Sequence, residues 1–491
     1  MSNLRKNSAG SRKSYKLSFY KINIHIFSVY CKIKEKGVLM MLIDDLKAVV
    51  GQVSTNETIL EHHSKTLTYH KPSMPDVVVF PKTEEELVGI VNVAKKYKKP
   101  IVPYGVGTSL EAQTIPYYGG IVVDFSEMNQ ILAVRPEDFT VTVQPGVTRE
   151  QLNQALKRYG LFFPVDPGAN ATIGGMTATN ASGTNAVKYG TMRQQVRKLR
   201  VVLASGEVIT AGADVAKTSA GYAIKDLFVG SEGTLGLFSE ITLKLYGIEE
   251  YSAIAKLTFE QIADASDAAY QILSSGMKVT KIELLDAQTI AIVNEQSQTD
   301  LMVAPSLLIE LSGGKEEVEL QLATLRELAE DWTCAVQMET DSLARAKLWQ
   351  ARHDAAMSIA AANPGKQLMF TDVCVPLSKL SAAILNARKV VDEHKMQASI
   401  FGHVGDGNFH VAMAIDQHND EELAIMHAIN DKIVEFALDL GGTCTGEHGV
   451  GIGKKRYLHQ EHASTLAIMK DIKKLLDPNN LLSPGVLFNV E

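Results

Sequence analysis

Two histidines in a short glycine-rich segment are the strongest chemical signal in the sequence. His403 and His410 flank Gly405-Asp406-Gly407-Asn408, which is typical of a tight turn between two strands. If these four residues form the turn, His403 lies directly opposite His410, with Cβ atoms roughly 4.5–5.5 Å apart. Two imidazoles on one face of a hairpin could share a divalent metal ion.

A third ligand for such a metal could come from a later glycine-flanked loop, in which Glu447 and His448 are neighbours. Two histidines, one carboxylate and open positions are typical of a catalytic metal site rather than a structural one. The donor types suit zinc, manganese or iron(II). The same residues also fit a simpler arrangement, in which the histidines are half-exposed strand residues and Glu447 caps a helix.

A glycine turn directly follows a predicted strand over residues 101–104. Gly105 and Gly107 can take positive φ and expose successive backbone N–H groups, beside the hydroxyls of Thr108 and Ser109. This arrangement could bind a diphosphate, and a plain tight turn fits equally well. The order G-x-G-T-S lacks the third glycine of the Rossmann motif, which argues against NAD bound in that manner.

A basic pair, Arg352-His353, ends a predicted helix over residues 341–353. A guanidinium group at this place could hold a carboxylate through two parallel hydrogen bonds, or it could be an ordinary solvated charge. We expect six other histidines to be surface or packing residues, with His353 the one most worth following. These are His62, His63, His70, His353, His418 and His427.

The elements that must position these residues fall into two groups, with a boundary near residue 248. The first contains predicted strands at 77–80, 101–104, 121–124, 139–144, 199–203 and 241–246, and helices at 83–98 and 148–158. Residues 164–193 have little periodicity, so we predict a long functional loop there. The second group alternates helices at 259–276, 315–330, 420–440 and 461–476 with strands at 281–285, 306–311 and 334–338.

The composition excludes several classes of protein. The chain of 491 residues is 45% hydrophobic and 21% charged, a globular balance, and it has no apolar run of 18 residues. Four scattered cysteines without a C-x-x-C pair argue against a disulfide scaffold, a zinc ribbon and an iron–sulfur centre. Nine of the 49 Lys and Arg residues lie in residues 1–40, so the rest of the chain is acidic. We therefore expect no nucleic-acid partner.

The basic leader, residues 1–40, has three interpretations. It resembles a mitochondrial transit peptide in being rich in Ser, Lys and Arg. It could instead be a basic arm that contacts an anionic membrane. In the third, translation starts at Met40 or Met41, where an ordinary first helix begins, and the leader is absent from the native protein. The corresponding locations are mitochondrial, or cytoplasmic and peripheral at the inner face of a membrane.

Four glycine-rich segments together resemble one family. They are the turn at 105–109, the loop 166–176, the run 180–190 and the segment 230–236. In order and spacing they are similar to the FAD-binding domain of the vanillyl-alcohol oxidase, or PCMH, type. The stretches PYGVGTSLEA, ASGTNAVKYGTMR and TDVCVP look most like cytochrome-linked D-lactate dehydrogenases, and next like glycolate oxidase flavin subunits and D-2-hydroxyglutarate dehydrogenases.

The resemblance implies an α+β protein with an FAD-binding domain over residues 41–248. An α+β cap domain over residues 249–491 would then carry the substrate and the metal and end in a helical segment. Members that attach FAD covalently use a histidine near the first turn, and this chain has none there, so dissociable FAD is expected. Ala112 stands where relatives often carry glycine. The expected cofactor-binding residues are Pro103, Tyr104, Gly105, Val106, Gly107, Thr108, Ser109, Pro167, Gly168, Thr172, Gly174, Gly175, Thr179, Ser182, Gly183, Tyr189, Gly190, Glu232 and Gly233.

The resemblance also assigns roles in the second domain. Metal-containing relatives share H-x-x-x-G-N-x-H and a later E-H, which implies His403, His410 and Glu447 as metal ligands and His448 as the base. Arg352 stands where relatives hold the substrate carboxylate. Dicarboxylate-selective relatives use a lysine near the place of Phe370, which favours a small monocarboxylic acid here, although Lys366 is close by.

The expected function is therefore FAD- and metal-dependent oxidation of D-lactate, or a similar small D-2-hydroxy acid, to the 2-oxo acid. The chain has no second redox motif, so electrons would pass to an external acceptor: a cytochrome, a quinone or a partner flavoprotein. A homodimer is a further expectation. The nearest alternative is a glycolate oxidase flavin subunit. More distant ones are a metal-dependent hydrolase and a non-catalytic nucleotide-binding module.

Overall fold

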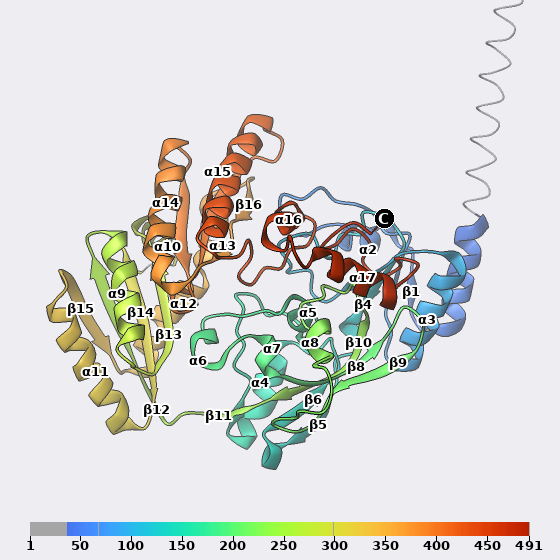
Figure 1. Ribbon diagram of the computed structural model, residues 1–491, viewed down its shortest axis with the longest axis horizontal. Helices are drawn as coiled ribbons and strands as arrows, with labels where there is room; N and C mark the ends of the chain where they lie inside the picture. The colour runs from blue at the N-terminus through green and yellow to red at the C-terminus, as the bar shows by residue number, and fades with distance from the viewer. Residues whose placement is uncertain (1–36, 67, 298, 491) are drawn as a thin grey trace, which may run out of the picture.

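The computed structural model describes residues 37–66, 68–297 and 299–490. Two units lie side by side, and the C-terminal helices return to the first of them (Figure 1). The expectation for the basic leader falls almost wholly outside the described residues. Residues 37–49 form the predicted first helix, which packs Leu42 and Leu46 into the core of the first unit. None of the described helices is both long enough and apolar enough to cross a bilayer.

The first unit contains two main sheets. One has four strands in the order β1-β2-β4-β3, in which β2, β4 and β3 run parallel. The other has five antiparallel strands in the order β5-β6-β10-β8-β9. The strands are β1 (Val53–Ser54), β2 (Val77–Val79), β3 (Ile101–Tyr104), β4 (Ile121–Asp124), β5 (Ile131–Arg135), β6 (Thr140–Val143), β8 (Val196–Val202), β9 (Val208–Gly212) and β10 (Leu237–Lys244).

Helix α3 (Glu84–Tyr97) connects β2 to β3 and shows why this unit folds as predicted. The Thr83 side chain caps its first turn, which carries three glutamates, and Lys95 and Lys96 lie in its last turn. Both features stabilise the helix through its dipole. Its buried face, which includes Leu87 and Ile90, packs on the parallel strands. The helix therefore holds β3 in place, and the glycine turn begins where β3 ends.

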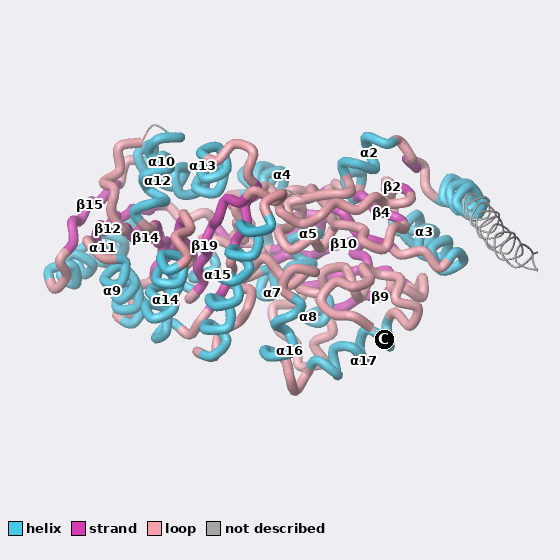
Figure 2. The backbone as a smooth tube through the Cα atoms, turned by 90° about the horizontal axis from the view of Figure 1, so that it is seen from above, coloured by secondary structure: helices cyan, strands magenta, loops and turns pink. Residues whose placement is uncertain are grey.

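The second unit is an antiparallel sheet covered by helices on both faces. The strand order is β15-β12-β14-β13-β18-β19-β16, and the short β17 also pairs with β19. Helices α9, α11, α14 and α15 lie on one side, and α10, α12 and α13 on the other (Figure 2). The elements are β12 (Tyr251–Phe259), α9 (Ile262–Ser274), β13 (Val279–Leu285), α10 (Ala287–Ser297), β14 (Ser306–Gly313), α11 (Lys315–Glu330), β15 (Cys334–Glu339), α12 (Ser342–His353), α13 (Ala355–Ala362), β16 (Gln367–Phe370), β17 (Val373–Cys374), α14 (Leu380–Glu393), β18 (Ala398–Gly402), β19 (Asn408–Ile415) and α15 (Asp420–Asp439).

Residues 164–193 differ from the predicted long loop, because three short helices occupy much of this stretch. They are α5 (Ile173–Thr179), α6 (Ala186–Tyr189) and α7 (Met192–Gln195). Each is too short to show a helical hydrophobic period in the sequence, and Gly183 and Gly190, both at positive φ, separate them. The interpretation as a loop was therefore wrong in detail.

The C-terminal segment fastens the second unit to the first. After α15, the chain runs through a loop over residues 441–453, α16 (Leu458–Glu461) and α17 (Leu466–Leu476) to the edge of the first sheet. There Ile101 of β3 exchanges backbone hydrogen bonds with Leu481 and Ser483, at 2.7 and 2.8 Å. The strand before the glycine turn is thus completed by residues near the end of the chain.

Candidate active site

Three predicted metal ligands converge at the junction of the two units. His403 directly follows β18, His410 lies in β19, and Glu447 comes from the loop after α15. Glu447 Oε1 lies 3.1 Å from His403 Nε2 and 3.3 Å from His410 Nε2. Both histidines are buried, and the three donor atoms face a common point. Two imidazole nitrogens and a carboxylate oxygen in this arrangement can hold a divalent metal ion.

The hairpin reaches this geometry by a register different from the predicted one. His410 pairs with Phe401, and the bend includes His403 and a turn of 3₁₀ helix, η5 (Val404–Asp406). The prediction that His403 pairs directly with His410 was therefore wrong, and the true register is shifted by two residues. Because side chains alternate with a period of two, a shift of two leaves both histidines on the same face as diagonal neighbours. Their ring centroids are 5.5 Å apart.

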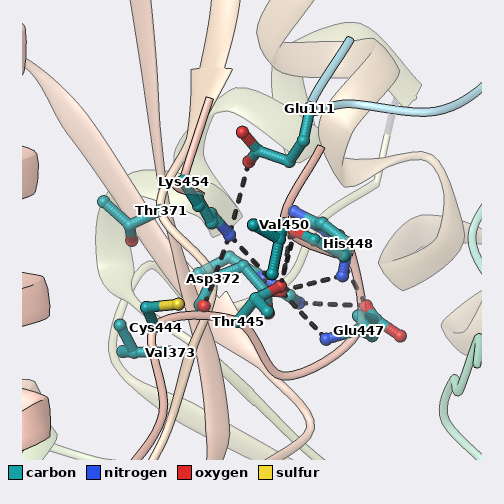
Figure 3. A network of polar contacts seen from close by, with 12 residues as sticks. Glu111, Thr371, Asp372, Val373, Cys444, Thr445, Glu447, His448, Val450 and Lys454 are labelled. Carbon is teal, nitrogen blue, oxygen red and sulfur yellow. Dashed lines mark hydrogen bonds and ion pairs between the residues drawn. The ribbon is translucent and has the colours of Figure 1, made fainter. Parts of the chain in front are cut away.

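Asp372 holds the loop that carries Glu447 and His448 (Figure 3). Its fully buried carboxylate accepts hydrogen bonds from the backbone N–H groups of Glu447 and His448, at 2.9 and 2.8 Å, and from the hydroxyl of Thr445, at 2.7 Å. Burial opposes the charge on Asp372, but His448 and Lys454 hold its pKa well below the usual range. The loop is therefore anchored on an ionised carboxylate.

A second group of possible ligands, Asp372, His410 and His448, lies next to the first. In this group the negative charge of Asp372 is already balanced by a cation of the protein. The buried ammonium of Lys454 lies 3.6 Å from Asp372 Oδ2 and 3.3 Å from Glu111 Oε1. A divalent ion beside this lysine would be repelled. The group of His403, His410 and Glu447 is therefore the better metal site.

His448 is well suited to accept a proton. Its ring stacks on His410, with centroids 4.9 Å apart and planes at 7°, and its Nε2 lies 3.9 Å from Glu447 Oε1. Burial lowers the pKa of His448 to about 4, against the opposing effect of Asp372. The imidazole is therefore neutral at pH 7, as a general base must be.

A cavity of about 580 Å³ joins the glycine turn of the first unit to the group of His403, His410 and Glu447 in the second. Fifteen of the nineteen expected cofactor residues line it. They are Pro103, Tyr104, Gly105, Val106, Gly107, Thr108, Ser109, Pro167, Gly168, Thr172, Gly174, Gly175, Thr179, Glu232 and Gly233. All five expected metal, base and carboxylate-binding residues line it as well: Arg352, His403, His410, Glu447 and His448.

Four expected cofactor residues are not among the residues that line this cavity. Ser182 instead donates a hydrogen bond to Glu447 Oε2, at 3.3 Å. Gly183 lies against Asp166, Tyr189 packs with Phe162 and Tyr246, and Gly190 ends α6.

The glycine turn has the shape that a cofactor diphosphate requires. Gly107 has φ of +69°, and a Cβ atom on it would collide with the hydroxyl of Tyr104. A Cβ on Gly105 would collide with Thr172. Nearby Ala112 has φ of +62°, a conformation that favours glycine and costs alanine roughly 1 kcal/mol.

Arg352 lies at the end of α12, where its guanidinium stacks on the ring of Phe401 at 5.0 Å. It pairs with Glu283 of β13; the contacts of Glu283 and of Asp372 were not predicted from the sequence. For Glu283, the available signal was a carboxylate between the apolar residues Ile282 and Leu284 of a predicted strand. Phe370 lines the cavity, whereas Lys366 pairs with Glu422 on the surface, at 3.1 Å.

The fold and the cavity define an FAD-dependent oxidoreductase, and comparisons with known proteins give the family. Residues 75–212 match the model of the FAD binding domain, and residues 248–487 match that of the FAD linked oxidases, C-terminal domain. The chain belongs to the FAD-linked oxidase family. It binds FAD through its first unit, and its fold is of the vanillyl-alcohol oxidase type.

Curated relatives span nearly the whole chain. A probable mitochondrial D-lactate dehydrogenase of Danio rerio is 40% identical, over 90% of this chain and 91% of that protein. The mitochondrial D-lactate dehydrogenase [cytochrome] of Arabidopsis thaliana is 41% identical, over 92% and 81%. Glycolate oxidase subunit GlcD of Bacillus subtilis is 34% identical, over 91% and 97%. Among solved structures, p-cresol methylhydroxylase with substrate bound has a TM-score of 0.75 at 17% identity, covering 92% of this chain and 97% of that one.

Proposed function

We propose that the protein oxidises D-lactate, or a similar small D-2-hydroxy acid, to the corresponding 2-oxo acid. The observation that carries this proposal is the single cavity that joins the glycine turn to Arg352, His448 and the metal cluster. Bound FAD would supply a hydride acceptor at its flavin ring. The D-lactate dehydrogenases among the relatives support the substrate class.

A divalent metal fits the donor set of His403, His410 and Glu447. Burial alone would lower the pKa of His403, but the carboxylates of Glu283 and Glu447 raise it well above the usual value. The cluster therefore stabilises positive charge, as a metal site must. Zinc, manganese and iron(II) all accept two imidazoles and one carboxylate. A metal ion held there would supply a Lewis acid for the substrate hydroxyl.

The chain's own residues would then bind and deprotonate the substrate. The Arg352 guanidinium binds the carboxylate and so orients C2 of the hydroxy acid. His448 accepts the hydroxyl proton at Nε2, which faces the cluster. The C2 hydride and this proton together account for the two electrons and two protons of the oxidation.

The surroundings of Phe370 and Lys281 support a small substrate. Phe370 lies 6.1 Å from the His448 ring, where a bulky apolar group limits the space beyond C2. Lys281 also lines the cavity, but its ammonium lies over the ring of Trp349, at 4.6 Å, and near the carboxylate of Glu310. A second substrate carboxylate would have to compete for Lys281 with Glu310. We therefore place lactate ahead of 2-hydroxyglutarate.

The electrons would leave to an external acceptor, and several relatives are named for a cytochrome. A quinone or a partner flavoprotein is the alternative acceptor, and a homodimer the proposed assembly. The division at residues 41–248 and 249–491 also stands as a proposal. The location, mitochondrial or cytoplasmic and peripheral to a membrane, depends on whether the leader is translated. N-terminal sequencing of the native protein tests this.

A glycolate oxidase flavin subunit is the second candidate, because GlcD matches 91% of the chain. Such a subunit would purify from its native source with an iron–sulfur partner. The hydrolase and nucleotide-binding-module alternatives have no support in the family matches.

The visible spectrum of the FAD-loaded protein under anaerobic conditions tests the proposal directly. We expect D-lactate to bleach the flavin band and L-lactate to leave it unchanged. A band indifferent to D-lactate but bleached by glycolate would move the function to the second candidate. Protein that takes up no FAD would overturn both.

A variant tests the role of the base. His448→Asn should reduce the rate of flavin bleaching by roughly 10²–10⁴-fold, because the proton acceptor is lost. His418→Asn, on an exposed turn, is the matched control and should bleach at the wild-type rate. An equal rate in the two variants would remove His448 from the reaction.

A further inference from the structure

Glu283 is a fully buried carboxylate in the middle of a sheet. It lies in β13, between Ile282 and Leu284, and none of its surface is exposed. Removing a carboxylate from water is costly unless charged partners and hydrogen bonds replace the solvent. The partners of Glu283 therefore show what its burial achieves.

Each oxygen of Glu283 contacts a different part of the active site. Oε1 accepts a hydrogen bond from His403 Nδ1 at 2.7 Å. Oε2 accepts a hydrogen bond from Arg352 Nε, at 2.8 Å, and forms an ion pair with Nη2 of the same side chain, at 2.7 Å. One carboxylate thus connects a candidate metal ligand to the candidate carboxylate-binding arginine.

The contact with His403 selects the nitrogen that faces the cluster. Because Nδ1 donates its proton to Glu283, the lone pair of a neutral ring is on Nε2, the atom 3.1 Å from Glu447 Oε1. A carboxylate behind a histidine ligand also fixes the ring orientation and increases its basicity. Asp372 lies behind His410 at a longer distance, 3.5 Å.

The contact with Arg352 selects the face of the guanidinium that is left for a substrate. Glu283 takes the Nε–Nη2 side, and the planar group is held flat on Phe401. Of the five N–H donors, both on Nη1 and one on Nη2 remain. This end of the group is suited to a bidentate carboxylate.

We propose that Glu283 is a positioning residue. Its carboxylate fixes the orientation of two side chains together, the candidate metal ligand His403 and the arginine Arg352. The inference rests on the proposed function and extends it, because it makes metal affinity and substrate affinity depend on the same buried carboxylate. A carboxylate that only stabilised the sheet would affect neither quantity.

The test compares Glu283→Gln with Asp286→Asn in the FAD-loaded protein. Both changes remove one buried negative charge, and Asp286 directly follows β13 but contacts Thr289 and Ile400 instead of the site. Zinc affinity, measured by competition with a chromogenic chelator, should fall roughly 10–100-fold in Glu283→Gln. Its KM for D-lactate should rise about tenfold or more, since one good hydrogen-bonded charge contact is lost. Asp286→Asn should change both quantities less than twofold.

Zinc affinity and KM within twofold of wild type in Glu283→Gln would overturn the role of Glu283. If the wild-type protein in the same experiment binds zinc and its flavin is bleached by D-lactate, the proposed function is retained. A wild-type protein that binds no divalent metal would overturn the metal site and the inference together.

A measurement on the wild type keeps the inference testable if Glu283→Gln does not fold. Nitrogen-15 NMR of histidine-labelled, zinc-loaded protein should show His403 protonated at Nδ1 and deprotonated at Nε2, assigned by loss of the signal in His403→Gln. A ring protonated at Nε2 instead would contradict the contact with Glu283.

Discussion

At the scale of single residues, the buried charges of the active site occur in matched sets. Glu283 pairs with Arg352 and His403, and Lys454 lies between Asp372 and Glu111. Each set joins the metal and base region to a different part of the protein. Buried pairs of this kind add little net stability but strongly disfavour other arrangements of the same side chains.

His70 gives a prediction about pH. Its ring stacks on Tyr69, and burial lowers its pKa to about 4, below the ordinary value of 6.5. The unfolded chain therefore binds a proton at His70 more tightly than the folded protein does. The stability that depends on neutral His70 is complete above about pH 6.5 and is lost as the pH falls towards 4.

Replacing this histidine should remove that loss. We expect His70→Phe to keep the stacking on Tyr69. Between pH 7 and pH 5, its free energy of unfolding should fall by about 2 kcal/mol less than that of the wild type. Urea unfolding at both pH values measures the difference. An equal loss in both proteins would mean that His70 does not carry the effect.

The candidate metal ligands could be proposed from the sequence because short motifs contain them. His403 and His410 are seven residues apart, and Glu447 and His448 are neighbours, so their types and spacing were visible. Glu283 could not be found in this way. Its contact with His403 depends on the pairing of β13 with β18, which joins residues 120 positions apart.

At the scale of elements, the bend between β18 and β19 shows how glycine shapes the site. Gly407 has φ of +79°, and a Cβ atom on it would collide with the carbonyl oxygen of Val375. Gly365 has a similar φ of +83° but has no other group close to it among the described residues. A substitution at Gly365 therefore tests the cost of backbone strain alone, and one at Gly407 tests strain together with steric collision.

Substituting both glycines tests this difference. Gly365→Ala should cost roughly 1 kcal/mol, the cost of the left-handed conformation alone. Gly407→Ala should cost at least ~2 kcal/mol more, because the hairpin must also move away from Val375. Urea unfolding of the second unit, followed by the fluorescence of its tryptophans, gives both values. Equal costs would show that the hairpin tolerates the methyl group.

Elements with a clear apolar pattern could be predicted from the sequence, and the three short helices α5, α6 and α7 could not. The predicted bounds of β3, β4 and α11 match the structure, because each has a clear apolar pattern and a clear end signal. The helices α5, α6 and α7 have neither. The lack of periodicity indicated a functional segment, and the family resemblance assigned cofactor-binding residues to it, an assignment that stays a prediction.

At the scale of the whole molecule, the active site depends on contacts between the two units. Glu232 of the first unit accepts hydrogen bonds from the backbone of Val450 and Gly451, at 2.7 and 2.8 Å. Gln113 donates to the carbonyl of His448, at 2.8 Å. The loop that carries Glu447 and His448 is thus held from both sides, and neither unit contains a complete candidate site.

Lys473 of α17 tests how much the C-terminal segment contributes. Its buried ammonium donates to the carbonyl oxygens of Thr234 and Leu482, both at 2.8 Å, and to Asp477. Lys473→Met leaves Asp477 buried without its cation, which should cost ~3–5 kcal/mol. The temperature at which the flavin is released should therefore fall.

The neighbouring Lys474 is exposed and provides the control. Lys474→Met should release its flavin at the wild-type temperature, because no buried contact changes. If Lys473→Met also kept that temperature, the C-terminal segment would not be needed to hold the cofactor-binding unit together.

The pairing of Ile101 with Leu481 and Ser483 has a consequence for biosynthesis. The strand that carries the glycine turn emerges early from the ribosome, but its edge partner is made roughly 380 residues later. At about 5–20 residues per second, the delay is on the order of 20–75 s. The edge of β3 lacks this backbone partner during that time, so we expect flavin to be bound only after the whole chain has been made. Ribosome-bound chains stalled before residue 480 would then be free of flavin.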